Sequence, residues 1–206
     1  MENEILGNHK RYLERKKLYQ NYGFDIDKER RSIFDKAGPV SGRILEVGTG
    51  KGHFTFVLAG EGHRFTSIDV SEEEQKIARL NLQYFHLEDL VDFRVENAER
   101  LSFKDRSFNI VFSVNTIHHL KNPFRVMDEI NRVVDFGGRI ILADFNKAGF
   151  EVLDRLHAAE GNLHDVSGFN LRDMSGFLSG KGFKIEVIES GFQEMLIADK
   201  PGVQKL

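Results

Sequence analysis

The chain has 206 residues, of which 40% are hydrophobic, a formal net charge of −3 and no cysteine. This length and composition are typical of one globular domain, and the small net charge gives no general attraction to nucleic acid or anionic membranes. The missing cysteine excludes disulfides, thiolate metal sites and cysteine nucleophiles. With no apolar run near the roughly 20 residues of a membrane span and no signal-peptide core, we expect a cytoplasmic protein.

Residues 1–39 are predicted to form a helical segment ahead of the first strand. Residues 4–22 are rich in helix formers and contain no proline. Asp27 is predicted to cap a second helix, which ends at the stop signal Gly38-Pro39. Basic residues are interleaved with tyrosines and leucines in the first helix. This pattern fits a lid over an active site, a basic edge for an anionic substrate, or a solvated helix whose aromatic face packs on the domain. In the lid hypothesis Tyr12, Tyr19 or Tyr22 faces the cofactor cleft and closes it from solvent.

A glycine-rich turn follows the first predicted strand, residues 44–47. Gly48, Gly50 and Gly52 stand at alternate positions, and a helix is predicted over residues 54–59. A turn without side chains lets the backbone approach a ligand closely, and the helix behind it offers unpaired N–H groups. In α/β sheets such a turn lies at the carboxyl edge of the strands, where nucleotide ligands bind. We therefore predict a cofactor-binding loop.

The spacing of this loop indicates which cofactor it suits. The dinucleotide fingerprint is Gly-x-Gly-x-x-Gly, with its helix directed at a pyrophosphate. Here the third glycine comes one residue early, and a carboxylate, Glu46, stands two residues before the first glycine. An acidic group there opposes a phosphate but suits a ligand that carries an ammonium group. The stretch from Glu46 to Gly52 resembles motif I of the class I S-adenosylmethionine-dependent methyltransferases, acidic-x-Gly-x-Gly-x-Gly.

The next two strands also end in polar residues. Residues 64–68 form a predicted strand that ends at Asp69, the position of the ribose-binding acid in nucleotide-binding α/β folds. Ser71 and Glu74 then form a predicted capping box for the following helix. A third strand over residues 91–95 is followed by Asn97 and Ala98. The alternatives are that Asp69 is an ordinary loop residue and that Asn97 only shapes its turn.

The middle of the chain extends the resemblance. A fourth strand over residues 108–114 leads into Asn115-Thr116-Ile117-His118-His119, and Asn122-Pro123 starts a helix. Gly137-Gly138 then turns the chain into a fifth strand over residues 139–145. This order is similar to the small-molecule branch of the class I methyltransferases, which includes the ubiquinone and menaquinone biosynthesis enzymes. Asp135-Phe136 stands where that branch usually has Lys-Pro, in a surface turn.

The C-terminal part completes the predicted layout. A helix over residues 150–160 and an irregular loop over 161–169 precede a helix capped by Asn170. Residues 183–189 and 192–199 alternate around Ser190-Gly191 and form a predicted hairpin. The resemblance covers about residues 40–199. It implies an α/β fold, a Rossmann-like three-layer sandwich with a mostly parallel seven-stranded sheet and an antiparallel C-terminal strand, in an S-adenosylmethionine-binding methyltransferase domain of residues 40–206.

The resemblance also implies the ligand and its binding residues. The cofactor would be S-adenosylmethionine, converted to S-adenosylhomocysteine as a methyl group passes to a small-molecule acceptor. Glu46 would lie at the ammonium end, Gly48 and Gly50 against the methionine moiety, Asp69 at the ribose, Val70 on the adenine face, and Asn97 with Ala98 at the adenine edge. Thr49, Gly52 and Asn115 complete the predicted cofactor set.

The acceptor side is less constrained. His119, just past the fourth strand, is our predicted general base or substrate contact, because histidine titrates near neutral pH. His118 competes for that role, and a histidine packed in a turn is the alternative. A metal site is not expected, since His118, His119, His157, His164 and Asp165 show no known zinc spacing.

Three further alternatives remain at this point. A nicotinamide-dependent oxidoreductase would need the dinucleotide fingerprint and a catalytic pair such as Tyr/Lys, neither of which is found. A binding protein that keeps the cofactor but has lost catalysis would look the same in sequence. A nucleic-acid substrate is not expected, because the Asn/Asp-Pro-Pro-aromatic motif is absent after the fourth strand and no nucleic-acid domain is present. The sequence makes no prediction of the oligomeric state.

Overall fold

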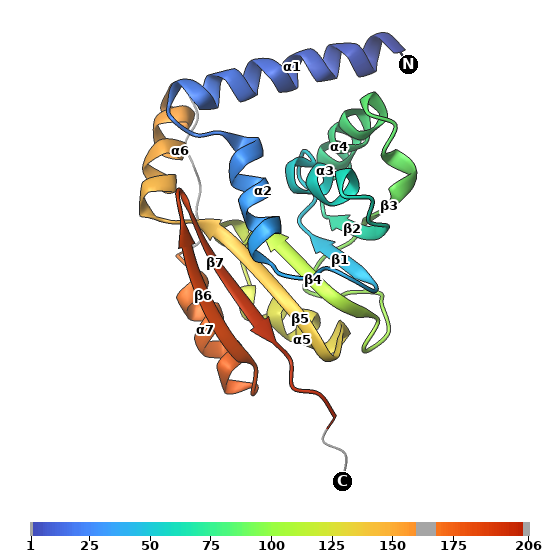
Figure 1. Ribbon diagram of the computed structural model, residues 1–206, viewed down its shortest axis with the longest axis vertical. Coiled ribbons are helices and arrows are strands. Elements are labelled where there is room, and N and C mark those ends of the chain that lie inside the picture. The colour runs from blue at the N-terminus through green and yellow to red at the C-terminus, as the bar shows by residue number, and fades with distance from the viewer. Residues whose placement is uncertain (1, 160–167, 204–206) are drawn as a thin grey trace.

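The computed structural model describes residues 2–159 and 168–203, and its centre is a seven-stranded sheet in the order β3-β2-β1-β4-β5-β7-β6 (Figure 1). The first five strands run parallel, and β7 is antiparallel to both neighbours, β5 and β6. The predicted sheet, with its one antiparallel strand at the C-terminal end of the chain, is confirmed. The strands are β1 Ile44–Val47, β2 Phe65–Asp69, β3 Val91–Val95, β4 Phe108–Val114, β5 Val134–Phe145, β6 Lys184–Ser190 and β7 Gln193–Asp199.

Helices cover both faces of the sheet, which confirms the predicted three layers. Helices α5 and α7 bury their apolar residues against one face, and α2, α3 and α4 bury theirs against the other. Both cores are built from the aliphatic and phenylalanine residues that alternate along β1, β4 and β5. The helices are α1 Glu2–Asn21, α2 Ile26–Lys36, α3 His53–Gly60, α4 Glu72–Tyr84, α5 Pro123–Val133, α6 Lys147–Ala159 and α7 Leu171–Gly180.

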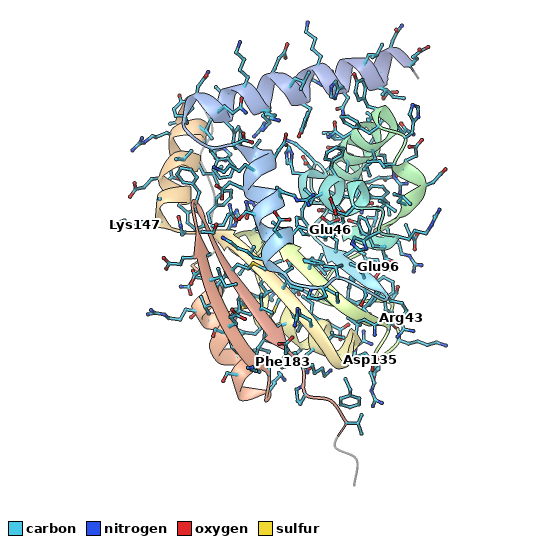
Figure 2. The ribbon with its side chains drawn as sticks, in the orientation of Figure 1. Arg43, Glu46, Glu96, Asp135, Lys147 and Phe183 are labelled. Carbon is cyan, nitrogen blue, oxygen red and sulfur yellow. The ribbon has the colours of Figure 1, made fainter. Side chains whose placement is uncertain are left out.

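The strand order reverses between β1 and β4. From β1 the chain adds β2 and β3 on one side, and from β4 it continues on the other side. A crevice outside the carboxyl ends of the strands forms at such a switch point. Figure 2 shows Glu46 at the end of β1 that faces this crevice, whereas Arg43 and Asp135, 3.8 Å apart, mark the opposite edge.

The N-terminal helices lie over the crevice end of the sheet (Figure 1). Helix α1 packs against α4, and its last turn joins α6 in a small apolar cluster. Helix α2 buries Ile33 in the main core, and Tyr12 Oη donates to Asp27 Oδ1 at 2.6 Å, so α1 is tied to α2. The predicted cap is wrong: Asp25, not Asp27, accepts from the backbone N–H groups at the start of α2. Asp27 instead serves the contact between the helices.

Other element ends differ from the prediction for local reasons. Strand β5 begins at Val134, not at the predicted residue 139. Gly137 adopts φ 69° inside the strand and does not form a turn ahead of it. Ser71 caps α4 through Glu74 N at 3.1 Å, but Ser71 N donates to Asp69, so the capping box is only half formed. No helix in the described part of the chain is long and apolar enough to cross a membrane.

Candidate functional site

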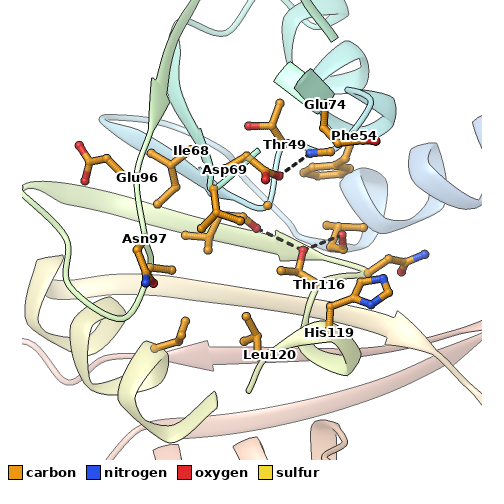
Figure 3. A pocket seen from close by; sticks show the side chains of 18 of the residues that line it. Thr49, Phe54, Ile68, Asp69, Glu74, Glu96, Asn97, Thr116, His119 and Leu120 are labelled. Atoms are coloured by element: carbon orange, nitrogen blue, oxygen red, sulfur yellow. Dashed lines mark hydrogen bonds between the residues drawn. The ribbon is translucent and has the colours of Figure 1, made fainter. Parts of the chain in front are cut away.

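A cavity lies in the crevice at the carboxyl ends of β1 and β4, and we call it the main cavity (Figure 3). Its volume is about 620 Å³, which is within the usual range for small-ligand sites. The predicted site residues come from four separate chain segments, and the fold brings most of them to this one place. Those that line the cavity are Gly48, Thr49, Gly50, Asp69, Val70, Asn97, Ala98, Asn115 and His119.

The glycine loop is fixed to its neighbours by backbone contacts. Gly48 N and Thr49 N both donate to Ile68 O, at 2.8 and 3.1 Å. Gly48 adopts φ 91°, and a Cβ there would lie 2.1 Å from Thr116 Oγ1. Only glycine therefore allows the loop after β1 and the turn after β4 to meet at the cavity wall.

Two predicted cofactor residues lie away from the cavity. Glu46 is 1% exposed, and its Oε2 accepts from Thr55 Oγ1 at 2.8 Å and Ser67 Oγ at 2.6 Å. Gly52 adopts φ 82° at the start of α3, where it packs against Ala78. The prediction that Glu46 reaches the ligand's ammonium end is therefore not supported by its position. Its carboxylate instead holds β1, β2 and α3 together beneath the glycine loop.

Burial raises the pKa of Glu46 from 4.5 to about 7, against the two hydroxyl donors that favour its ionised form. A raised carboxyl pKa means that the folded state holds the proton between these values while the unfolded state has lost it. The stabilising contribution is thus complete below about pH 4.5 and is lost as pH rises through about 7.

We expect Glu46→Gln to remove this part of the pH dependence of stability. The amide carries no charge, so its burial costs the same at every pH, whereas wild-type Glu46 must ionise inside the protein above neutrality. Urea unfolding at about pH 5 and about pH 8 measures the effect: the free energy of unfolding should fall less for the variant than for wild type. The exposed Glu186→Gln is the matched control and should follow wild type. Parallel pH profiles for Glu46→Gln and wild type would contradict the assignment.

Asp69 lies at the cavity wall between the glycine loop and α4. Its Oδ2 accepts from Gly50 N at 2.8 Å and its Oδ1 from Ser71 N at 2.9 Å. A carboxylate has about four lone-pair sites, so each oxygen can still accept from a ligand hydroxyl. Val70, beside it, lines the cavity and is 69% exposed, so its side chain is free to contact a ligand.

We expect Asp69→Ala to weaken the binding of S-adenosylhomocysteine by about 1.5–3 kcal/mol, which is the scale of a charge-assisted hydrogen bond. Calorimetric titration measures the effect. The control is Asp92→Ala, since Asp92 is an exposed carboxylate on β3 whose partner is Arg94. An Asp69→Ala protein that binds as wild type does would make Asp69 an ordinary loop residue.

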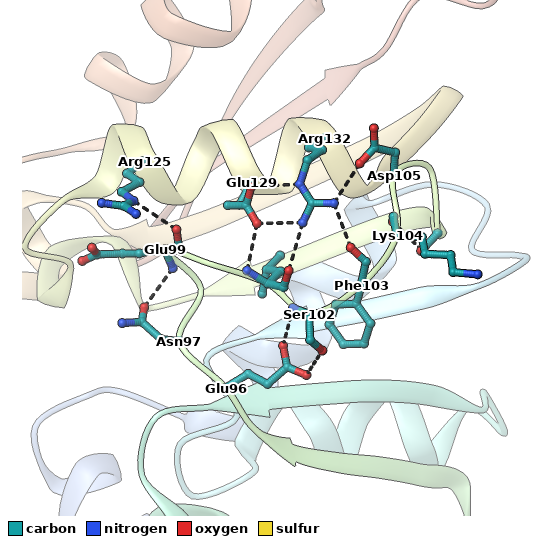
Figure 4. A network of polar contacts seen from close by, with 12 residues as sticks. Glu96, Asn97, Glu99, Ser102, Phe103, Lys104, Asp105, Arg125, Glu129 and Arg132 are labelled. Carbon is teal, nitrogen blue, oxygen red and sulfur yellow. Dashed lines mark hydrogen bonds and ion pairs between the residues drawn. The ribbon is translucent and has the colours of Figure 1, made fainter.

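The loop after β3 is held by helix α5 (Figure 4). Arg132 donates to Glu129 Oε1 and Oε2, at 2.8 and 2.7 Å, and to the carbonyl oxygens of Leu101 and Phe103. Glu129 Oε2 also accepts from Leu101 N at 2.8 Å. The hydrogen bonds to Glu129 raise the pKa of Arg132, and those from Arg132 lower the pKa of Glu129. This ion pair positions the loop in which Asn97 presents its side chain to the cavity.

Asn115 begins the turn after β4 in a left-handed conformation, φ 53°. With its amide assigned from the hydrogen-bond network, its oxygen accepts from Arg30 Nη2 at 2.6 Å and its nitrogen donates to Gln193 Oε1 at 2.7 Å. Arg30 comes from α2, is 8% exposed, and burial lowers its pKa to about 10. It lines the main cavity, although no sequence motif marks it.

The two adjacent histidines have different surroundings. His118 is buried, and Asp144 holds it twice: its Oδ1 lies 2.5 Å from His118 Nδ1 and its Oδ2 accepts from His118 N at 3.0 Å. His119 is exposed and lines the main cavity, with its ring 4.0 Å from that of His118. The buried pair therefore fixes the turn, and the fixed turn presents His119 to the ligand space.

A second cavity of about 250 Å³, which we call the side cavity, adjoins the main one. The residues that line both cavities are Arg30, Lys51, His53, Glu74, Asn115 and His119. Burial and the nearby charge of Arg30 lower the pKa of His53 to about 3, so this imidazole is neutral at physiological pH. The sequence analysis missed Arg30 and His53. The position of His53 directly after Gly52 was the only available signal.

None of the three tyrosines proposed for a lid lines the main cavity. Tyr19 lines the side cavity, and Tyr12 lines a separate cavity between α1 and α4. The expectation that one of them faces the cofactor cleft therefore stays a prediction, with Tyr19 in the adjoining cavity. The role of α1 as a lid remains a prediction.

The structure tests the metal-site alternative only for the residues that it describes. Across residues 2–159 and 168–203, no group of three or more histidine, cysteine or acidic side chains is placed to hold a metal ion. His164 and Asp165, which belonged to that alternative, lie outside the described residues.

The comparisons with known proteins agree with this geometry. Residues 45–142 match a family model described as a methyltransferase domain. The chain is 30% identical over 152 residues to 27-O-demethylrifamycin SV methyltransferase of Amycolatopsis mediterranei, covering 71% of this chain and 56% of the relative. It is 28% identical over 171 residues to a ubiquinone/menaquinone biosynthesis C-methyltransferase of a Bradyrhizobium species, covering 75% and 64%. The matches thus span a little over half to two thirds of these relatives' lengths.

The fold comparison points the same way. A solved structure of a SAM-dependent methyltransferase from Aquifex aeolicus superposes with a TM-score of 0.64 at 20% identity, covering 82% of this chain and 88% of that one. At this identity the likeness concerns the fold. Residues 45–142 are therefore similar to a methyltransferase domain, and the chain shares its fold with a solved SAM-dependent methyltransferase.

Proposed function

We propose that this protein transfers a methyl group from S-adenosylmethionine to a small-molecule acceptor. The observation that supports the proposal best is the meeting of four segments at one cavity: the glycine loop, Asp69, Asn97 with Ala98, and the turn at Asn115. These residues are far apart in the chain, and their types suit the successive parts of this one ligand. The names of the relatives agree with the proposal.

The residues would hold the cofactor in an extended path across the strand ends. The methionine moiety would lie against Gly48 and Gly50, where no side chain stands in its way. Asp69 would accept from the ribose hydroxyls, and Val70 would cover one adenine face. Asn97 can accept from the adenine amino group and donate to a ring nitrogen. The ion pair of α5 described above would keep Asn97 in position.

The transfer itself is an in-line displacement at the methyl carbon. The acceptor atom forms a bond to that carbon while the carbon–sulfur bond breaks. The electron pair of the broken bond stays on sulfur, which becomes a thioether. If the acceptor is a hydroxyl or an amine, its proton passes to a base, for which His119 is placed between the two cavities. The protein's main contribution is to align the two reactants and to exclude water.

The direct test is calorimetric titration with S-adenosylhomocysteine and, separately, with NAD and NADP. We expect S-adenosylhomocysteine to bind and neither dinucleotide to give measurable heat, because the loop lacks the pyrophosphate spacing. Transfer of a labelled methyl group to members of a small-molecule panel then separates an enzyme from a protein that only binds the cofactor. Tight NAD binding without S-adenosylhomocysteine binding would overturn the proposal.

A further inference from the structure

The side cavity contains a buried cation with no counter-ion. Arg30 is 8% exposed, and its side chain bonds to the uncharged amide of Asn115. In the part of the chain that the structure describes, no carboxylate oxygen lies within 4.0 Å of the Arg30 guanidinium, the limit for an ion pair. A buried charge without a partner costs several kcal/mol, and burial accordingly lowers the pKa of Arg30.

The two carboxylates that act on Arg30 do not pair with it. Asp144 uses one oxygen for the ring of His118 and Phe145 N, and the other for His118 N. Glu29 neighbours Arg30 in α2, but its carboxylate lies beside Gly191, where Oε2 is buried without a hydrogen-bond partner. Both attract Arg30 only at a distance. The guanidinium thus retains donors for an anion that comes from outside the chain, and its planar fork matches a carboxylate.

The side cavity is small, and aromatic rings form one part of its wall. The ring centroids of Phe24 and Phe145 lie 5.7 Å apart at a tilt of 50°, and that of Tyr19 lies 5.8 Å from that of Phe24. The wall also includes aliphatic and charged side chains: Ile26, Leu153, Arg15, Lys51 and Glu74. The Arg30 guanidinium lies 6.0 Å from the Phe145 ring centroid. A volume of about 250 Å³ is just below the range of drug-sized pockets, so the occupant is small. Aromatic walls favour a planar ring, which stacks on or packs edge-on against them.

We propose that the side cavity is the acceptor site, and that Arg30 selects acceptors that carry a carboxylate on a small aromatic ring. This inference rests on the proposed function, since it assigns the neighbouring main cavity to S-adenosylmethionine. The negative charge would complete the ion pair that Arg30 lacks. The ring would lie among the phenylalanines, and the atom to be methylated would point toward the main cavity and His119.

The cofactor is a second source of a carboxylate for Arg30. Its methionine part carries one, and Arg30 lines the main cavity as well. An experiment must therefore measure the acid preference of the acceptor site separately from the affinity for the cofactor.

The test titrates benzoate and phenylacetate, and their uncharged amides benzamide and phenylacetamide, into protein saturated with S-adenosylhomocysteine. We expect wild type to bind the acids about 10- to 100-fold more tightly than the amides, the range of one charge-assisted contact. Arg30→Gln should lose this preference, and Arg30→Lys should fall between; the affinity of each variant for S-adenosylhomocysteine is measured in a separate titration. Arg31→Gln is the control, since Arg31 is an exposed neighbour paired with Asp35 and Glu61.

Three results would overturn the inference. Amides that bind wild type as tightly as the acids would remove the role of charge, and failure of all four probes to bind would remove the aromatic acceptor site. An Arg30→Gln protein with weakened S-adenosylhomocysteine binding and an intact acid preference would assign Arg30 to the cofactor. The comparison of probes on wild type holds even if a variant fails to fold. Loss of S-adenosylhomocysteine binding by wild type, in contrast, would refute the proposed function itself.

Discussion

Replacing Gly48 with alanine is expected to abolish the binding of S-adenosylhomocysteine. A Cβ at this position would lie 2.1 Å from Thr116 Oγ1 and 2.8 Å from Thr116 Cγ2, far inside van der Waals contact. The residue also has φ 91°, which side chains rarely adopt. The loop after β1 and the turn after β4 would have to separate at the cavity wall. We expect an affinity loss of about 100-fold or more, equivalent to about 3 kcal/mol of overpacking, measured by calorimetry.

The control separates this collision from the general cost of a positive φ. Gly62, just past α3, has φ 80°, but a Cβ there meets no heavy atom within 4 Å. Gly62→Ala should therefore lose some thermal stability and keep its affinity. Combining Gly48→Ala with Thr116→Gly removes the collision and should recover part of the binding. A Gly48→Ala protein that binds within about threefold of wild type would show that the loop can move without harm to the site.

The second large effect is expected on turnover, at His119. For a hydroxyl or amine acceptor found in the methyl-transfer panel, His119→Ala should slow turnover by about 10²–10⁴-fold, the usual range for loss of a general base. Affinity for S-adenosylhomocysteine should hardly change, because Asp69 and Asn97 are expected to carry it. Thermal stability should also hold, because His119 is exposed. The measurements are initial rates, calorimetry and thermal unfolding on one protein preparation.

His118 provides the internal comparison. Its side chain is buried against Asp144, so His118→Ala should lower the melting temperature by leaving that carboxylate without its ring partner. His63→Ala, whose imidazole contacts Phe34 outside both cavities, should change neither property. Full activity of His119→Ala, together with a folded but inactive His118→Ala, would transfer the role of base to His118. Full activity of both would leave proton transfer to another group or to water.

The sequence by itself determined the order of the elements and predicted that the residues proposed for the cofactor meet at one edge of the sheet. Short apolar strands such as residues 44–47 and 108–114 are buried on both faces, so they read as nearly continuous hydrophobic runs. Gly48 follows the first strand directly, Asp69 ends the second, and Asn97 comes two residues after the third. Because parallel strands end at the same edge, residues that follow them must meet there, and the local pattern was enough to predict the meeting.

Only the tertiary structure decided which way each of these side chains points. Glu46 lies inside β1, and the two sides of a strand have different neighbours, so its burial beneath the loop depends on Ser67 and Thr55. The predicted ligand contact of this residue is not supported by its position, because motif spacing fixes its place along the chain but not the face on which its carboxylate lies. The pairing of His118 with Asp144 likewise joins two strand ends that no local pattern connects.

The acceptor side depended most on tertiary structure. Arg30 belongs to a helix that precedes the first strand, and it reaches the cavity because α2 packs on the same core as α3. It lacks an ion pair because Asp144 is bonded to His118 and the Glu29 carboxylate lies beside Gly191. A buried charge is recognisable only when its surroundings are known, because the free energy of burial depends on every group around it. Sequence order therefore located the cofactor loop, whereas the packing of distant segments created the side cavity.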